Sequence, residues 1–116
     1  MRKRGEVYWV QFDPSVGTEI RKRRPAVTVS VDFVNRKGFR YQVIPFTPNL
    51  SKVYPSEVVV RFKDGLSKAA VDQIATVSKE RFGKRLDRLR TKEMGKLEEK
   101  IKFVLGLTPK ATAEEE

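Results

Sequence analysis

The sequence predicts an α+β domain that is mostly β, with a single helix at its C-terminal end. Four short segments rich in β-branched and aromatic residues follow one another between residues 5 and 62, separated by turn-forming residues. Beyond residue 90 the apolar spacing changes from that of a strand to that of a helix. Strands followed by one packed helix are typical of an α+β domain built on a small curled sheet or barrel.

The first two expected strands flank a long polar loop. GEVYWVQF, Gly5–Phe12, is rich in aromatic and β-branched residues and ends at the turn-forming pair Asp13-Pro14. Residues 13–24 follow as a loop too long for a tight hairpin, and loops of about 12 residues without structure of their own are often functional. Pro25 then opens PAVTVSV, at the strand position that tolerates proline best.

Three further strands and one helix complete the expected fold. The strands are YQVIPF (41–46), in which Pro45 indicates an edge strand or a bulge, SEVVVRF (56–62) and a short strand at 70–77. In residues 91–105, the apolar residues Met94, Leu97, Ile101, Val104 and Leu105 share one helical face. Thr91 is the expected N-cap, Glu93 suits the first turn, and Gly106 ends the helix.

Length and composition indicate one small domain. With 116 residues the chain can form one modest core, so we expect residues 1–106 to fold as a single domain and residues 107–116 to be a flexible tail. No apolar run approaches the roughly 20 residues of a membrane span, and the basic start is not followed by the apolar stretch of a secretory leader. The chain has no cysteine, which fits a cytoplasmic protein.

The charge is strongly positive. The chain has 25 basic and 15 acidic residues, and residues 1–106 hold 24 and 12 of these, a net charge of +12. A small domain this basic usually has a polyanionic partner, most often nucleic acid. Solubility, or the charge-rich surface of a thermophile protein, is the alternative explanation.

Catalysis without histidine and cysteine has to use other side chains. The chain contains neither residue, and no spacing of carboxylates indicates a metal site, so we expect no metal and no cofactor. Arginine suits work on nucleic acid because its planar guanidinium binds phosphate through two hydrogen bonds and stays charged.

Arg24 is the foremost candidate catalytic residue. It ends the run Arg21–Arg24, and Pro25 biases its backbone toward an extended conformation at the start of a strand. Glu19 is a candidate proton acceptor or a partner in a salt bridge that closes the loop. Thr47 follows the third expected strand, where its hydroxyl could donate to a phosphate oxygen. The alternative is that the basic run is only a solvated electrostatic patch.

Two further groups have a functional and a structural interpretation. A second basic cluster could extend a phosphate track or form an ordinary solvated face; it comprises Lys79, Arg81, Lys84, Arg85, Arg88 and Arg90. Four aromatic residues could stack on bases, although each fits a core position better; they are Tyr8, Trp9, Phe39 and Tyr41.

Four ordered blocks of the sequence resemble the MazF/PemK toxins. They are RGEVYWVQFDPSVGTEI, RPAVTVS, VIPFT and DQIATVSKERFGKRLDRL, and the resemblance spans Lys3 to Leu107. It implies a small SH3-like β-barrel with a C-terminal helix and the activity of a metal-independent, sequence-selective endoribonuclease (mRNA interferase) from a type II toxin–antitoxin module. It also implies a homodimer with a groove for single-stranded RNA, inhibited by an acidic antitoxin protein.

The resemblance assigns roles to particular residues. The family's catalytic arginine and threonine fall on Arg24 and Thr47, and its loop glutamate falls on Glu19. The residues expected to bind RNA are Arg21, Lys22, Arg23, Gln73, Thr76 and Arg81. Ala75 departs from the pattern, because many members have arginine there; the chain is either weakened at this point or compensated by Arg81.

The reaction implied is attack of a ribose 2′-OH on the adjacent phosphorus, with Arg24 stabilising the charge that develops. Two alternatives remain open at this point. One is a CcdB-like poison of DNA gyrase, which shares the barrel but need not keep the Arg-Pro and Pro-x-Thr arrangement. The other is a non-catalytic SH3-like module, since basic charge alone gives RNA binding.

Overall fold

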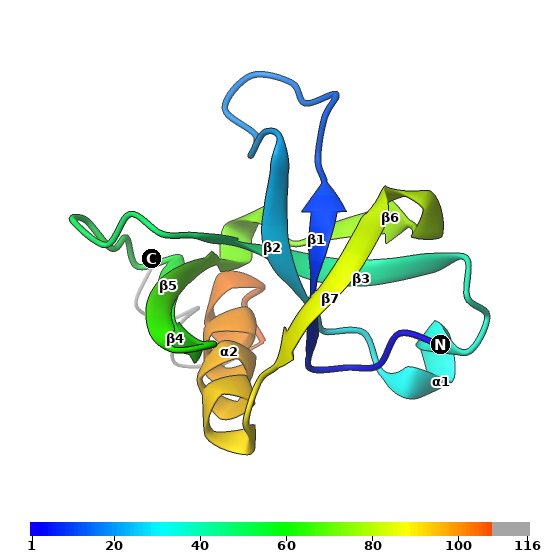
Figure 1. The fold of residues 1–116 in the computed structure, drawn as a ribbon. Coiled ribbons are helices and arrows are strands. Elements are labelled where there is room, and N and C mark those ends of the chain that lie inside the picture. The colour runs from blue at the N-terminus through cyan, green and yellow to red at the C-terminus, as the bar shows by residue number, and fades with distance from the viewer. Residues whose placement is uncertain (108–116) are drawn as a thin grey trace.

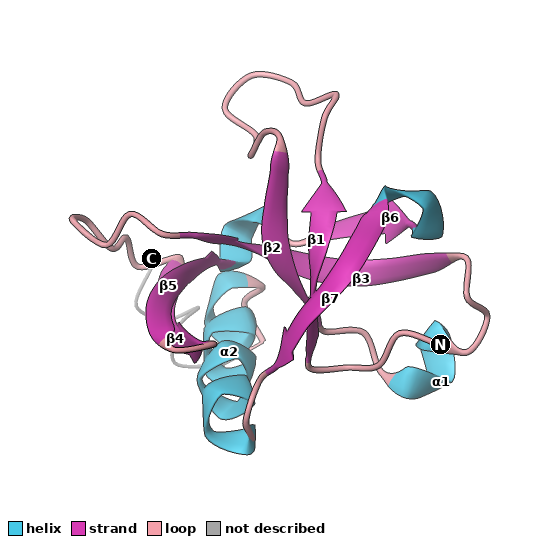
Figure 2. Ribbon diagram, viewed as in Figure 1, coloured by secondary structure: helices cyan, strands magenta, loops and turns pink. Residues whose placement is uncertain are grey.

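The computed structural model describes residues 1–107 as a curled, mostly antiparallel sheet with a helix packed against it (Figures 1 and 2). In chain order the elements are β1 (Glu6–Gln11), β2 (Arg23–Thr28), α1 (Asp32–Asn35), β3 (Arg40–Thr47), β4 (Glu57–Phe62), β5 (Gly65–Ala70), the 3₁₀ turn η1 (Val71–Gln73), β6 (Ala75–Ser78), the 3₁₀ turn η2 (Lys79–Arg81), β7 (Phe82–Arg88) and α2 (Thr91–Val104). The expected α+β, mostly β fold with a C-terminal helix is confirmed. Of the expected tail, 108–116 lies outside the described residues.

Strand β3 is the centre of the sheet. The strand order is β4-β5-β3-β2-β1-β7, and β6 also pairs with β3. Strand β3 therefore bonds to β2 on one side and to β6 and then β5 on the other. In Figure 1, β3 runs across the direction of β1 and β2, so the sheet curls around it.

Pro45 lies where β3 changes partner, so the expectation of an edge strand is wrong. Pairing with β6 ends at Val43, and pairing with β5 begins at Phe46. The carbonyl of Gln42 accepts a hydrogen bond from Val29 N–H, so the backbone groups of Gln42 point toward β2. Because backbone groups alternate in direction along a strand, those of even-numbered β3 residues point toward β2 and those of odd-numbered residues toward β6 and β5. The missing N–H of Pro45 thus falls in the gap between two partners, where no ladder bond is lost.

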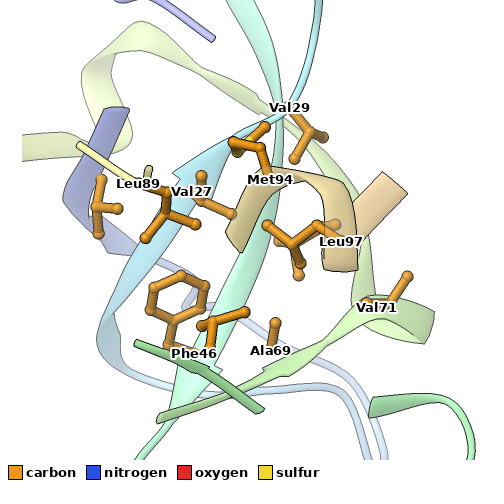
Figure 3. Close-up of a cluster of buried hydrophobic side chains, with 11 residues drawn as sticks. Val27, Val29, Phe46, Ala69, Val71, Leu89, Met94 and Leu97 are labelled. Atoms are coloured by element: carbon orange, nitrogen blue, oxygen red, sulfur yellow. The ribbon is translucent and has the colours of Figure 1, made fainter. Parts of the chain in front are cut away.

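The larger core cluster lies between the sheet and α2 (Figure 3). Met94 and Leu97 of α2 face Val27, Phe46 and Ala69 of the strands, and Leu97 is fully buried. Successive strand residues point to opposite faces, so the face of β3 that carries Phe46 is turned toward the helix. This cluster fixes α2 on one side of the sheet.

The opposite face of the sheet closes over a second, aromatic cluster. Phe82 packs edge-on against Tyr8 and Tyr41, with ring centroids 5.5 and 5.1 Å apart. The Arg2 guanidinium lies over the same rings, 4.6 Å from the centroid of Phe82. Burial, together with the hydrogen bond that its hydroxyl donates to Glu6, raises the pKa of Tyr8 to about 12. Tyr8 and Tyr41 are thus core residues.

Several boundaries differ from the sequence-based expectation. Strand β2 begins at Arg23, two residues before Pro25, because its pairing with β1 extends to Gln11. The strand expected at 70–77 is the end of β5, then η1, then β6. Residues 82–88 form β7, which pairs with β1, although their charged sequence resembles a solvated face. Strand β7 can be this polar because it lies at the end of the strand order and none of its residues is buried, so its charged side chains can stay in solvent.

Helix α2 begins at Thr91, and the expected cap at Thr91 is wrong. Arg90 occupies the N-cap position, and no side chain caps the helix. The buried carboxylate of Glu93 in the first turn instead accepts from Arg61 N–H (2.5 Å) and Lys96 (3.4 Å), which ties the helix to β4. Leu105, which was expected on the apolar face of the helix, follows its last residue and is half exposed. Gly106 comes next and has the positive φ that is common where a helix ends. Within residues 1–107, no helix is long and apolar enough to cross a bilayer.

The environment of Glu93 also links stability to pH. Burial acts to raise the pKa of this carboxyl, but the hydrogen bonds from Arg61 and Lys96 outweigh it and the pKa lies below its ordinary value of 4.5. A carboxyl with a lowered pKa stabilises the fold above its unfolded-state pKa. That stabilisation is lost as the pH falls through the lowered value.

Truncating Leu97 tests the packing of α2. Because this side chain is fully buried in the larger core cluster, Leu97→Ala should lower the free energy of unfolding by about 2–5 kcal/mol, measured by urea denaturation. Leu105→Ala is the matched control on the same segment and should change the free energy by less than about 0.5 kcal/mol. Equal effects from the two variants would contradict the packing described.

Candidate functional site

A groove of about 1120 Å³ opens between two loops. One wall is the loop between β1 and β2, and the other is the connection between β3 and β4. Figure 1 shows the first rising above the sheet and the second extending away to the left of it. The floor lies where the ends of β2 and β3 diverge between these walls.

Arg24 and Thr47 lie on opposite sides of the gap that opens between the ends of β2 and β3. The last pair between β2 and β3 is Ala26 with Pro45, and Arg24 and Thr47 each lie two residues beyond that pair on their own strand. Residues two apart on a strand share a face, so the two side chains lie on the same face of the sheet. Both line the groove. The register thus brings together the two residues expected to be catalytic.

The backbone around Arg24 orients its guanidinium. The Nε of Arg24 donates to the carbonyl oxygen of Arg21 at 2.9 Å, and Arg24 is only partly exposed. Pro25 restricts Arg24 to an extended conformation, and its pairing with Val10 of β1 holds it in the sheet. Within the described residues, none of the side chains of Arg21–Arg24 forms a salt bridge. Their positive charge is therefore available to an anionic ligand.

Three of the four basic residues border the groove. Arg21, Lys22 and Arg24 line it, whereas the guanidinium of Arg23 lies over the ring of Trp9, 4.7 Å from its centroid. Neighbouring residues of a strand point to opposite faces, and Arg23 follows this alternation away from Arg24. Arg23 therefore lies away from the groove, and its expected role in RNA binding stays a prediction.

Glu19 and Gln73 shape the loop between β1 and β2. The carboxylate of Glu19 accepts from Val16 N–H at 2.9 Å, and the side-chain oxygen of Gln73 accepts from Ile20 N–H at 3.3 Å. Both side chains line the groove. Gln73 therefore connects the loop to η1. Glu19 closes a turn inside the loop and forms no salt bridge with any residue of 1–107.

Thr76 and Arg81 lie in a smaller hollow of about 460 Å³ that also includes Glu19 and Gln73. The hydroxyl of Thr76 accepts from the Gln42 side-chain amide at 3.0 Å. One Nη of Arg81 donates to two backbone carbonyls at the start of the loop, those of Gln11 (2.9 Å) and Asp13 (2.7 Å). Arg81 thus anchors the loop on which the groove depends.

Apart from Arg81, which lines the neighbouring hollow, the second basic cluster does not extend the groove. Lys84, Arg85 and Arg88 belong to β7 and are not among the groove's lining residues. Arg85 forms a salt bridge with Glu6 at 3.2 Å. Ala75, the position at which the sequence departs from the family pattern, belongs to β6. It is partly buried and packs against the aromatic cluster.

Several groove residues were not anticipated from the sequence, among them Tyr54, Glu57 and Lys68. Tyr54 is about half exposed, and the Tyr-Pro pair within a polar loop is the signal that could have identified it. Lys68 is buried and paired with Glu57 at 3.2 Å. No local signal marks it, because a lysine in a short polar segment is usually solvated.

No group of three histidine, cysteine or acidic side chains is placed to hold a metal ion in residues 1–107. The groove instead presents cationic and hydroxyl groups, namely Arg21, Lys22, Arg24 and Thr47. Such groups can neutralise and hydrogen-bond the oxygens of a phosphodiester. A negatively charged backbone is the ligand that this arrangement fits.

Comparison with known proteins gives one consistent result. Residues 3–105 match the family described as PemK-like, MazF-like toxin of type II toxin–antitoxin system. The chain is 36% identical over 116 residues to the endoribonuclease MazF9 of Mycobacterium tuberculosis, covering 92% of this chain and 98% of the relative. It is 31% identical over 103 residues to the endoribonuclease toxin MazF of Escherichia coli K12, covering 88% and 92%.

Solved structures of this family share the fold. A MazF from Deinococcus radiodurans superimposes with a TM-score of 0.79 at 24% identity, covering 90% of this chain and 96% of that one. A mycobacterial endoribonuclease in complex with its cognate antitoxin gives 0.77 at 22% identity, covering 93% and 98%.

Removing the Arg81 anchor should loosen the β1–β2 loop. A charge-assisted hydrogen bond contributes about 1.5–3 kcal/mol, so Arg81→Ala should speed amide hydrogen exchange in residues 13–20 by roughly tenfold or more, measured by mass spectrometry. Lys84→Ala, exposed on the neighbouring strand, is the control and should leave this exchange unchanged. Unchanged exchange in Arg81→Ala would show that the loop is held by other contacts.

Proposed function

We infer that this chain, which belongs to the PemK-like, MazF-like toxins of type II toxin–antitoxin systems, is an endoribonuclease that cuts single-stranded RNA, mRNA included. Three relatives named as endoribonucleases match it over 98%, 92% and 95% of their own length. The observation that carries the proposal is the placement of Arg24 and Thr47, two residues beyond the last β2–β3 pair and lining one groove.

The proposed reaction is an internal transfer of the phosphodiester. The 2′-oxygen of one ribose attacks the adjacent phosphorus, a new O2′–P bond forms, and the P–O5′ bond breaks. The 2′-OH proton passes to a base, and the departing 5′-oxygen takes up a proton. The products are a 2′,3′-cyclic phosphate, which water can open to a 3′-phosphate, and a 5′-OH.

Arg24 and Thr47 act on the phosphate oxygens in this proposal. The guanidinium stabilises the negative charge that grows on the non-bridging oxygens in the transition state, as fixed donors do in other enzymes. The hydroxyl of Thr47 donates a hydrogen bond to one of these oxygens. Because Arg24 supplies the positive charge, the reaction needs no divalent cation.

Glu19 is the proposed acceptor of the 2′-OH proton. It is the acidic side chain of the loop wall, and it lines the groove with Arg24. Its carboxylate accepts a hydrogen bond from Val16 N–H, which keeps it within the wall and directs it into the loop. A movement of the loop when RNA binds would bring the carboxylate to the reacting ribose.

The remaining groove residues bind RNA without reacting. Arg21 and Lys22 attract the phosphates next to the one that is cut, and Gln73 presents an amide to the bases or sugars. Thr76 and Arg81 extend this surface into the neighbouring hollow. The sequence that is cut depends on these side chains and on the conformation of the two walls.

The partners follow from family and charge. We propose that an acidic antitoxin protein neutralises the toxin by covering this basic groove, and that the chain acts in the cytoplasm as a homodimer. The net charge of +12 in residues 1–106 favours an acidic partner, and the solved mycobacterial relative was found with its cognate antitoxin.

The two alternatives receive less support. A CcdB-like gyrase poison does not need Arg24 and Thr47 to meet in one groove, yet the register brings them together. A non-catalytic RNA-binding module would need only the basic charge. Three relatives that match most of the chain are named as endoribonucleases.

The chemistry of the products tests the proposed reaction. With excess EDTA the purified protein should still cut a mixed-sequence RNA, and a substrate with a single 2′-deoxyribose at the cut should resist cleavage because the nucleophile is missing. End analysis should find 5′-OH groups. Loss of activity with EDTA that Mg²⁺ restores, or 5′-phosphate ends, would point to attack by an activated water.

Substitution of Arg24 separates catalysis from binding. Arg24→Ala should lower the single-turnover cleavage rate by roughly 10²–10³-fold, because one transition-state donor is lost. Arg24→Lys should also cleave slowly, since it keeps the charge but loses the planar pair of donors.

Arg23→Ala is the matched control, because it removes the same charge from the neighbouring residue, which lies on Trp9. It should cleave within about threefold of wild type, the scale of a surface-charge change. Melting temperature and mass must be checked for each variant. A folded Arg24→Ala protein with the wild-type rate would refute the catalytic assignment.

A further inference from the structure

Lys68 continues the row of side chains formed by Arg24 and Thr47. In the β3–β5 pair, Lys68 lies directly opposite Thr47. The preceding pair, Phe46 with Ala69, faces the larger core cluster, so Thr47 and Lys68 both lie on the other face of the sheet. Directly opposed residues have Cβ atoms about 4.5–5.5 Å apart. A buried lysine therefore lies beside the proposed catalytic threonine, and it lines the same groove.

The polar contacts of Lys68 converge on residues 52–57. Its Nζ donates to the carbonyl oxygen of Lys52 at 2.6 Å and pairs with a carboxylate oxygen of Glu57 at 3.2 Å. The same Glu57 oxygen accepts from Tyr54 N–H, and Glu57 N–H donates to the Tyr54 carbonyl, both at 2.9 Å. Lys68 thus fastens one turn of the groove wall to the strand position next to Thr47.

Neither fold stability nor direct catalysis explains this lysine. Removing an ammonium from water costs several kcal/mol, and a buried ion pair is often no better for stability than apolar residues of similar size. Lys68 is only 7% exposed, and Glu57 compensates its charge. It cannot present that charge freely to a phosphate. What the contacts provide is a fixed position for the turn.

The side chain that this turn presents to the groove is Tyr54. It is 49% exposed and lines the groove, and Pro55 restricts its backbone to an extended conformation. The Nζ atoms of Lys52 and Lys68 lie 4.8 and 5.9 Å from the centroid of its ring. An aromatic ring held from its backbone and exposed beside a cationic groove can stack on a nucleobase.

The energies favour a base over the ammonium of Lys52. An exposed cation–π contact contributes less binding free energy than the stacking of a base on an aromatic side chain does. A base can therefore displace the exposed Lys52 from the ring, and the released ammonium can move to a neighbouring phosphate.

From these contacts we propose that Tyr54 is a stacking platform for an RNA base next to the cut, and that Lys68 is the positioning residue that holds it beside Thr47. The proposal rests on the RNA-cleaving function inferred above and adds a binding element to it. A stack that forms equally in bound substrate and transition state lowers KM and leaves kcat unchanged. Lys68 acts on RNA only through Tyr54.

The test is a double-mutant cycle with steady-state kinetics on one RNA oligonucleotide. Tyr54→Ala should raise KM roughly 5- to 100-fold, the equivalent of one lost stack, with kcat within about twofold. Tyr54→Phe keeps the ring and should behave as wild type. The pair Lys68→Met with Glu57→Gln removes both charges together and keeps an oxygen to cap Tyr54 N–H. It should raise KM several-fold, and adding it to Tyr54→Ala should have no further effect.

Each outcome decides between the possibilities. Wild-type protein that fails to cut any RNA overturns the proposed function, and the inference with it. If wild type cuts, an unchanged KM in Tyr54→Ala refutes the platform alone, and effects that multiply in the combined variant refute the link from Lys68 to Tyr54. Melting curves accompany every variant. If the variant with both Lys68→Met and Glu57→Gln does not fold, Glu57→Gln alone replaces it in the same cycle. It should also raise KM, and an effect on KM that multiplies with that of Tyr54→Ala would again refute the link from Lys68 to Tyr54.

Discussion

The structure depends on the way β3 exchanges one partner strand for another at Pro45. Strand β3 pairs with β2 on one side and with β6 and then β5 on the other, and the sheet curls around it (Figure 1). The proline has no N–H to lose at the exchange, so the change of partner costs no ladder bond. Beyond this point β2 and β3 separate, and the opening between them is the groove. Arg24 and Thr47 lie on the two sides of the opening because the register is fixed at Ala26 and Pro45.

The walls of the groove are loops, yet contacts to regular elements hold both of them. Arg81 and Gln73 tie the β1–β2 loop to its own base and to η1. Lys68 and Glu57 tie the other wall to β5 and β4. A reaction whose rate depends on the position of two donors requires rigid mounts, and strand ends with tethered loops supply them. The basic residues left without salt bridges then give the groove its attraction for phosphate.

The fold class and the elements with a strong local pattern could be predicted from the sequence, whereas the pairing of the strands could not. Strands with strong alternation, and the amphipathic helix, could be predicted because their apolar periods are local. Strand β7 and the break at Pro45 could not, because pairing with β1, β5 and β6 is set by distant parts of the chain. The same limit applies to the site. Arg24 and Thr47 stand out beside prolines and strand ends, whereas Lys68 becomes informative only when the register places it opposite Thr47.

The central claim is that Arg24 and Thr47 act on the same phosphate, and a double-mutant cycle of single-turnover cleavage tests it most directly. Two residues that stabilise one transition state act as a unit, and their losses are strongly non-additive. The account predicts that the variant lacking both side chains cuts about as slowly as Arg24→Ala alone. Rate losses that multiply, in variants that melt like wild type, would mean that the two residues work at separate places and would contradict the account.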